Sequence, residues 1–213
     1  MFARLSGIVA VGALAVACAS QPQEGAAGAP AGTSPAVAPA APMAPVAQCE
    51  PSARMALEGR ASAYDSTIVQ LGGARAKVCY GRPQMRGRTV FGGLVPYDTL
   101  WRTGANEPTI IHMPVAGTIA GIRVDPGSYS IYTVPGREQW TVIVNRATAQ
   151  WGHESQYTPQ VRAQEVGRAQ VAAQRTTSPV EVFTIRSEAQ AGNAANLVLE
   201  WENTRVSIPI RPA

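Results

Sequence analysis

The chain has 213 residues, of which 46% are hydrophobic and 15% charged, and its 18 basic and 14 acidic residues give a net charge of +4. This length leaves room for one folded domain beside any targeting segment. The modest charge excess, with no basic run interleaved with aromatic residues outside residues 80–111, argues against nucleic acid as a partner. The two histidines have no metal-ligand spacing, so we expect no metal and no other cofactor.

The N-terminus has the layout of a secretory signal. Arg4 precedes an apolar stretch over residues 5–16, which is too short to span a membrane. LAVAC, at residues 14–18, is similar to a bacterial lipobox, in which the cysteine is lipidated and becomes the mature N-terminus. We therefore predict a signal peptide over residues 1–17 and lipidation of Cys18. The alternative is ordinary signal-peptidase cleavage of the same bond, which would leave Cys18 as a free thiol.

Residues 18–49 are predicted to form a disordered, lipid-anchored linker ahead of a folded domain at residues 50–213. Their composition is dominated by Ala, Pro, Gly, Ser and Gln, which cannot bury enough apolar surface to fold. Ala19 stands where an aspartate would favour retention in the inner membrane. We therefore expect an exported protein whose partner is the lipid bilayer, anchored in the outer membrane and facing the periplasm.

Cys49 and Cys79 form an even pair once Cys18 is lipidated. Disulfides persist in compartments beyond the inner membrane, so we predict a bridge between them. It would connect the start of the domain to an early strand. The alternative is that Cys79 is a buried, unbridged small hydrophobic residue.

The domain shows a hydrophobic period of two, which favours short antiparallel strands over helices. Gly72-Gly73 separates two predicted strands of a hairpin, at residues 67–70 and 74–80. Further strands are expected at residues 109–113 and 121–124 and, after the turn Asp125-Pro126-Gly127, at residues 128–134. Residues 140–145 are apolar on both faces, which indicates a central strand.

The C-terminal third is expected to add one helical turn and four strands. Thr158 can cap a short helix with Pro159 in its first position. A strand should begin near Val166, and a turn at residues 177–179 should lead to a strand at 180–185. A closing hairpin is expected from residues 197–201 and 205–210. The pattern predicts an all-β, antiparallel β-sandwich of nine or ten short strands with at most one short helix; a barrel is the second choice.

An ordered series of motifs runs through this domain. It comprises YGRP at residues 80–83, FGGLVPY at 91–97, WRTGANE at 101–107, PGSYSIYTVPG at 126–136, EQWTVIVN at 138–145 and LEWENTRVSIPI at 199–210. Over about residues 51 to 210 the chain resembles the bacterial domain-of-unknown-function 2911 family. The resemblance implies a β-rich domain of exported proteins and lipoproteins, and it brings no activity, cofactor or catalytic residue with it.

Residues 80–111 are the strongest candidate for a ligand-facing segment. Closely spaced Gly, Pro, Arg and aromatic residues specify an irregular backbone that presents charged side chains beside aromatic rings. Guanidinium and amide groups recognise carboxylate, phosphate or sugar oxygens. The candidate ligand-binding residues are Arg82, Arg88, Tyr97, Trp101, Arg102, Asn106, Glu107 and His112.

The same residues have a purely structural interpretation. Arg102 and Glu107 could form an ion pair that closes the loop, with Asn106 in a left-handed turn. Trp140, Trp151 and Trp201, with Tyr129 and Tyr132, could line a sugar-stacking face, but core packing is the favoured role for Trp140 and Trp201.

No catalytic residue is assigned, because the chain lacks the GxSxG and SxxK motifs and a cysteine free to react. We expect a non-catalytic module that binds a small polar ligand or a cell-envelope component. The alternatives are an enzyme acting on a polar substrate through the segment from Arg102 to His112, and a structural envelope lipoprotein.

Overall fold

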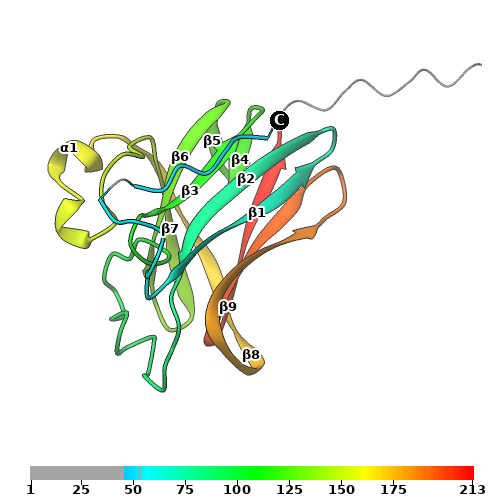
Figure 1. The fold of residues 1–213 in the computed structure, drawn as a ribbon. Coiled ribbons are helices and arrows are strands. Elements are labelled where there is room, and N and C mark those ends of the chain that lie inside the picture. The colour runs from blue at the N-terminus through cyan, green and yellow to red at the C-terminus, as the bar shows by residue number, and fades with distance from the viewer. Residues whose placement is uncertain (1–45, 53) are drawn as a thin grey trace, which may run out of the picture. The chain divides into compact units, whose positions relative to one another are not determined.

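The computed structural model describes residues 46–52 and 54–213, so the predicted signal peptide, Cys18 and most of the linker lie outside the described residues. Within the described part of the chain, no helix is both long and apolar enough to cross a membrane. The strands are β1 (Ala63–Leu71), β2 (Ala74–Arg82), β3 (Thr109–Met113), β4 (Gly117–Ile119), β5 (Ile122–Val124), β6 (Gly127–Pro135), β7 (Gln139–Asn145), β8 (Glu165–Ala189) and β9 (Ala195–Pro212). They are shown in Figure 1.

All nine strands belong to one antiparallel sheet with the order β1-β2-β3-β6-β7-β8-β9-β4-β5. The long strands β8 and β9 curve strongly (Figure 1). Both therefore contact β1, although other strands separate them from β1 in the sheet order. The end of β2 also meets the middle of β8, where the amide of Phe183 donates to the carbonyl of Pro83 at 2.9 Å. The prediction of an all-β, antiparallel domain is confirmed.

One hydrophobic core lies between the two halves of the curved sheet. It combines Val69 and Val78 of β1 and β2 with Ile185 of β8 and Leu197 of β9, all of which are buried. Fully buried apolar side chains of this kind supply most of the stability of a β domain. Trp140 and Trp201 belong to this core, as predicted, and Tyr129 is buried with them.

Strand β7 is apolar on both faces because it packs against two clusters. Trp140, Val142 and Val144 join the main core, whereas Ile143 joins a second cluster with Tyr132 and Tyr157. Val161 of a short α-helix, α1 (Pro159–Arg162), packs against that second cluster. Thr158 caps this helix and Pro159 occupies its first turn, as the sequence predicts.

The two long strands replace elements that were predicted to be shorter. The turn expected at residues 177–179 is wrong, because the chain continues through it as β8, with register shifts against β9 between Arg175 and Thr184. The prediction of a closing hairpin around residues 202–204 is also wrong. There β9 continues, and Glu202 takes a positive φ of 52°. Irregularities of this kind bend a strand without reversing its direction. Residues that favour turns are also found at such bends, which is why the sequence suggested turns here.

The predicted disulfide between Cys49 and Cys79 is present, with its Cα atoms 5.8 Å apart. Cys79 is buried in β2, so the bridge ties the segment at residues 46–52 to the sheet. This segment is therefore fixed at the edge of the domain.

Candidate functional site

The loop from Pro83 to Pro108 connects β2 to β3 and has little regular structure of its own. Several hydrogen bonds attach it to the sheet. Among them, the amide of Met85 donates to the carbonyl of Glu181, and the Glu202 carboxylate accepts the amides of Val90 and Phe91 at 3.2 and 3.1 Å. Trp101 pairs with Thr133 through two backbone hydrogen bonds. The loop is thus a shaped part of the domain.

Trp101 anchors the loop from within the core and is only 4% exposed. Its indole packs against Phe91, Trp140, Phe183 and Trp201 with ring centroids 5.2 to 6.0 Å apart. Its indole N–H donates to the carbonyl of Gly104 at 3.1 Å. The ring therefore offers a bound molecule only its carbon edge or face, and it sets the position of residues 104–106.

Residues 104–106 pass directly over the backbone of β2. A Cβ added at Gly81 would overlap the carbonyl oxygen of Ala105, so only glycine permits this approach. Asn106 then takes a left-handed conformation with a φ of 66°, as the structural interpretation of the sequence predicted. Its carbonyl accepts the amide of Gly152 at 3.1 Å.

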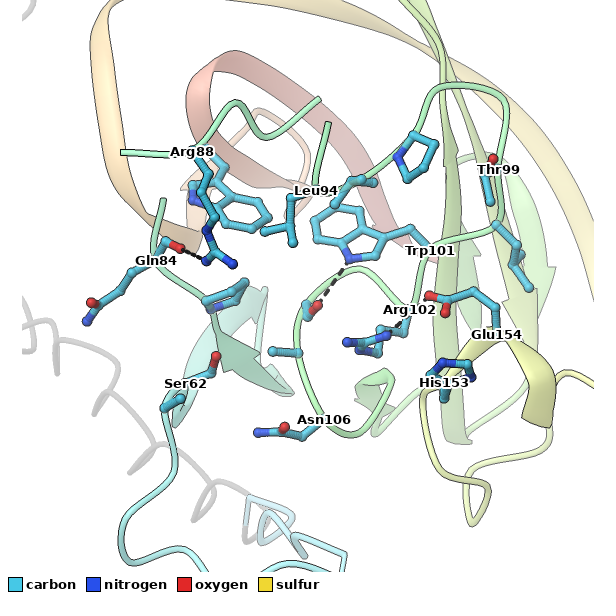
Figure 2. Close-up of a pocket in the computed structure, with 18 of the residues that line it drawn as sticks. Ser62, Gln84, Arg88, Leu94, Thr99, Trp101, Arg102, Asn106, His153 and Glu154 are labelled. Atoms are coloured by element: carbon cyan, nitrogen blue, oxygen red, sulfur yellow. Dashed lines mark hydrogen bonds and ion pairs between the residues drawn. The ribbon is translucent and has the colours of Figure 1, made fainter. Parts of the chain in front are cut away.

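A cavity of about 620 Å³ opens between this turn and the outer part of the loop. We call it the first cavity, and Figure 2 shows its lining. One wall is apolar and includes Leu94, Val95, Pro96 and Leu100, with the edges of Trp101 and Trp201. The polar wall consists of Gln84, Arg86, Arg88, Arg102, Asn106, His153 and Glu154.

Two buried donors at this cavity have no hydrogen-bond partner. They are Nδ2 of Asn106 and Nε of Arg102. Nη1 of the same arginine donates to Oε1 of Glu154 at 3.2 Å, so the guanidinium is only partly satisfied. Because a buried donor without a partner costs free energy, each of these groups needs an explanation, and an acceptor from outside the chain would supply one.

Arg88 is held by backbone carbonyls. Its guanidinium donates to the carbonyl oxygens of Met85 and Gln84, each at 2.9 Å. Arg86 is oriented in a similar way by the carbonyl of Ala61. Within the described residues, neither side chain has a carboxylate within ion-pair distance. Both guanidinium groups are therefore oriented at the cavity without being neutralised.

Glu107 does not pair with Arg102, so that part of the structural interpretation is wrong. Its carboxylate instead forms a two-pronged ion pair with Arg60, with both N–O distances 2.9 Å, and accepts the amide of Ser52 at 2.8 Å. The two side chains are 7% and 1% exposed. Glu107 thus fixes the N-terminal segment of the domain to the loop.

His112 lies at a different cavity, of about 600 Å³, which we call the second cavity. Its walls come from residues 47–52, from β3 and from the loop at residues 148–150, and they include Glu107 and Tyr64. The imidazole Nδ1 lies 2.7 Å from Oγ of Ser128. Burial lowers the pKa of His112 and Lys77 lowers it further, whereas Glu50 acts in the opposite direction.

Two further predicted residues contribute to the fold around the site. Arg82 forms an ion pair with Asp65 at 2.9 Å and reaches the backbone of β8. Tyr97 packs over Gly92, and the Arg137 guanidinium lies 4.6 Å from the centre of its ring. Neither residue lines the first cavity.

Of the eight predicted ligand-binding residues, the structure brings four together at the first cavity: Arg88, Trp101, Arg102 and Asn106. Arg86 also lines it; this residue is one of the arginines that the segment at residues 80–111 presents, but it was not among the eight candidates. Sequence reasoning missed Glu154 there, and it missed Arg60 as the partner of Glu107. Glu154 and Arg60 are distant in sequence, and no local pattern marks them. Within the described residues, no group of three or more His, Cys, Asp or Glu side chains could hold a metal ion.

Comparisons with known proteins agree with the resemblance noted in the sequence. The model of a family described as "Protein of unknown function (DUF2911)" matches residues 62–210, which are most of the chain. Searches of curated proteins and of solved structures found no match.

Proposed function

We propose that this chain, which belongs to the DUF2911 family, is an exported, lipid-anchored domain that binds a small polar ligand in the first cavity without catalysis. The observation that carries the proposal is the pair of buried, unpartnered donors on Asn106 and Arg102 in the wall of that cavity. Its volume lies within the range of about 300–1,000 Å³ typical of ligand sites, and such sites combine apolar walls with a few oriented polar groups.

A purely structural role would leave these groups satisfied by the protein itself. Glu107 fits that description, because Arg60 and Ser52 satisfy its carboxylate. The side-chain amide of Asn106 and Nε of Arg102 do not. The loop therefore combines one residue that stabilises the fold with two whose buried donors have no partner in the protein, and this difference favours binding.

The enzymatic alternative receives no support from the geometry. It uses the segment from Arg102 to His112 on one polar substrate, but Arg102 lines the first cavity, whereas His112 and Glu107 line the second. The carboxylate of Glu154 is engaged with Arg102, and that of Glu107 is engaged with Arg60. Neither carboxylate is therefore free to act as a general base.

The disulfide supports export, because structural disulfides persist in oxidising compartments. Lipid anchoring through Cys18 in the outer membrane rests on the lipobox-like sequence alone. It is tested by expressing the full chain in a Gram-negative bacterium. We expect the wild-type protein in the outer-membrane fraction with an acylated N-terminal Cys18, and the Cys18→Ser variant in the soluble periplasmic fraction. Wild-type protein in the soluble fraction, with an unmodified thiol, would reject the anchor.

The binding role is tested by native mass spectrometry of the protein as purified from cells. Asn106→Gly removes the amide while tolerating the left-handed backbone, and Arg102→Gln removes the charge. We expect a small-molecule adduct on the wild type that is reduced in both variants and retained in Arg211→Gln, whose exposed arginine lies outside the cavity. An adduct that is unaffected by both cavity variants would place binding elsewhere.

A further inference from the structure

The charges on the polar wall of the first cavity are unequal. Arg86, Arg88 and Arg102 face a single carboxylate, that of Glu154. The three arginines exceed the one glutamate of the lining by two positive charges. Glu181 lies nearby, but its carboxylate accepts the backbone amide of Arg86 at 2.8 Å, and the residue is not part of the lining.

The guanidinium groups of Arg86 and Arg88 are oriented by the protein itself. Carbonyl oxygens hold the guanidinium groups of Arg86 and Arg88, and each group keeps N–H donors that these contacts do not use. Arginine presents its donors as a rigid fork that matches the two oxygens of a carboxylate or phosphate. Asn106 Nδ2 and Arg102 Nε add two more donors from another part of the lining.

The other wall is largely apolar. It is formed by Leu94, Val95, Pro96 and Leu100, with the hydroxyl of Thr99 beside them, and the one N–H of the Trp101 indole is already used by the carbonyl of Gly104. Leu94 is 43% exposed, which is high for a leucine and leaves apolar surface open at the cavity. A ligand that satisfies both walls has an acidic group on one side and an apolar face on the other.

The second cavity lacks the arginines that line the first. Its lining includes Glu50 and Glu107, of which Glu107 is paired with Arg60, and it contains no arginine or lysine. A small acid therefore finds cationic partners in the lining of the first cavity and none in that of the second.

Building on the proposed function, we propose that the first cavity selects small organic acids: a carboxylate or phosphate held by Arg86, Arg88, Arg102 and Asn106, with an apolar portion on Leu94 and Trp101. The acid is bound as the anion, and no bond is made or broken. The acid group could belong to a free metabolite or to the headgroup of an envelope lipid, and both sources share this chemistry.

The test is a thermal-shift and calorimetric panel on the purified protein. Benzoate, phenyl phosphate, benzamide and benzylamine share one ring and differ in charge, and glucuronate, glucose and glucosamine form a second matched set. We expect an acid to bind at least about tenfold more tightly than its neutral and cationic counterparts, because hydrogen bonds between charged partners are stronger than those of neutral groups. Arg88→Gln should remove most of this preference, whereas Arg211→Gln should keep it.

The outcomes separate the two proposals. Equal or tighter binding of a neutral or cationic compound, abolished by Asn106→Gly, would overturn the selection of acids and leave the binding role intact. Failure of every compound of all three charges to bind would count against both. Displacement of a bound acid by phosphatidylglycerol vesicles, and not by phosphatidylcholine vesicles, would identify a lipid headgroup as the source; no displacement would identify a free acid.

Discussion

Asn106 and Glu107 are consecutive residues whose side chains belong to different cavities. The amide of Asn106 lines the first cavity and lacks a partner, whereas the carboxylate of Glu107 lines the second and is fully engaged by Arg60 and Ser52. Glu107 thereby fixes the backbone that presents Asn106. Of these two neighbours, Glu107 secures the position of the loop, and Asn106 carries a buried donor without a partner in the protein.

Removal of the Glu107 carboxylate should destabilise the domain. Glu107→Ala leaves the guanidinium of Arg60 buried without its counter-charge, and loss of one partner of a buried ion pair costs about 3–5 kcal/mol. Chemical denaturation of the variant and the wild type measures this difference. The control is Glu154→Ala, which breaks a partly exposed pair with Arg102 and should cost about 0–1 kcal/mol. Equal costs for the two variants would contradict the role of Glu107 as an anchor.

Gly152 should be required for the position of residues 102–107. A Cβ at this position would overlap the carbonyl of Asn106 and the side chain of Arg102, so Gly152→Ala must push the loop away. We expect lower thermal stability and weaker ligand binding together. Gly73→Ala is the matched control, because nothing lies within 4 Å of its added Cβ and its backbone is not left-handed. A Gly152→Ala protein that matched the Gly73→Ala protein in both measurements would refute this close packing.

The regular part of the fold could be predicted from local patterns. The Gly72-Gly73 hairpin, the strand at Thr109–Met113 and the cap at Thr158 each depend on neighbouring residues, and all are present. β4 (Gly117–Ile119) was missed. The continuous paths of β8 and β9 were missed because residues 177–179 and Glu202, which suggested turns, lie in irregular strand where sheet pairing decides the conformation.

The candidate site was predicted in part for a similar reason. The sequence marks the loop at residues 80–111 through its composition, and four of the candidate residues do meet at one cavity. It cannot show that Glu107 pairs with Arg60, 47 residues earlier, or that Glu154 reaches Arg102 from 52 residues later. It also cannot show that alternation along β3 places His112 at another cavity.

Reduction of the disulfide should lower stability. The bridge between Cys49 and Cys79 closes a loop of 30 residues, which corresponds to about 3–4 kcal/mol in the chain-entropy account. Urea unfolding with and without dithiothreitol measures the effect. A Cys49→Ala/Cys79→Ala variant should already show the reduced stability and should not respond to the reductant. An unchanged midpoint for the reduced wild type would show that the bridge contributes no stability.

Stability should fall on acidification partly through His112. Burial lowers its pKa in the folded domain, so the unfolded chain, with a pKa near 6.5, binds the proton more readily. The contribution is complete above about pH 6.5 and is lost as the pH falls through the lower folded pKa. Free energies of unfolding at pH 8 and pH 5 should therefore differ less in His112→Gln than in the wild type. A larger difference in the variant would reverse the assigned direction.

The most direct test of the binding site is a high-resolution crystal structure of the protein as purified from its native cells, with bound molecules retained. The account predicts non-protein density in the first cavity, within hydrogen-bond distance of Asn106 Nδ2 and Arg102 Nε and beside the guanidinium of Arg88. The contradictory result is a cavity filled by side chains of the loop itself, with both donors bonded to protein oxygens.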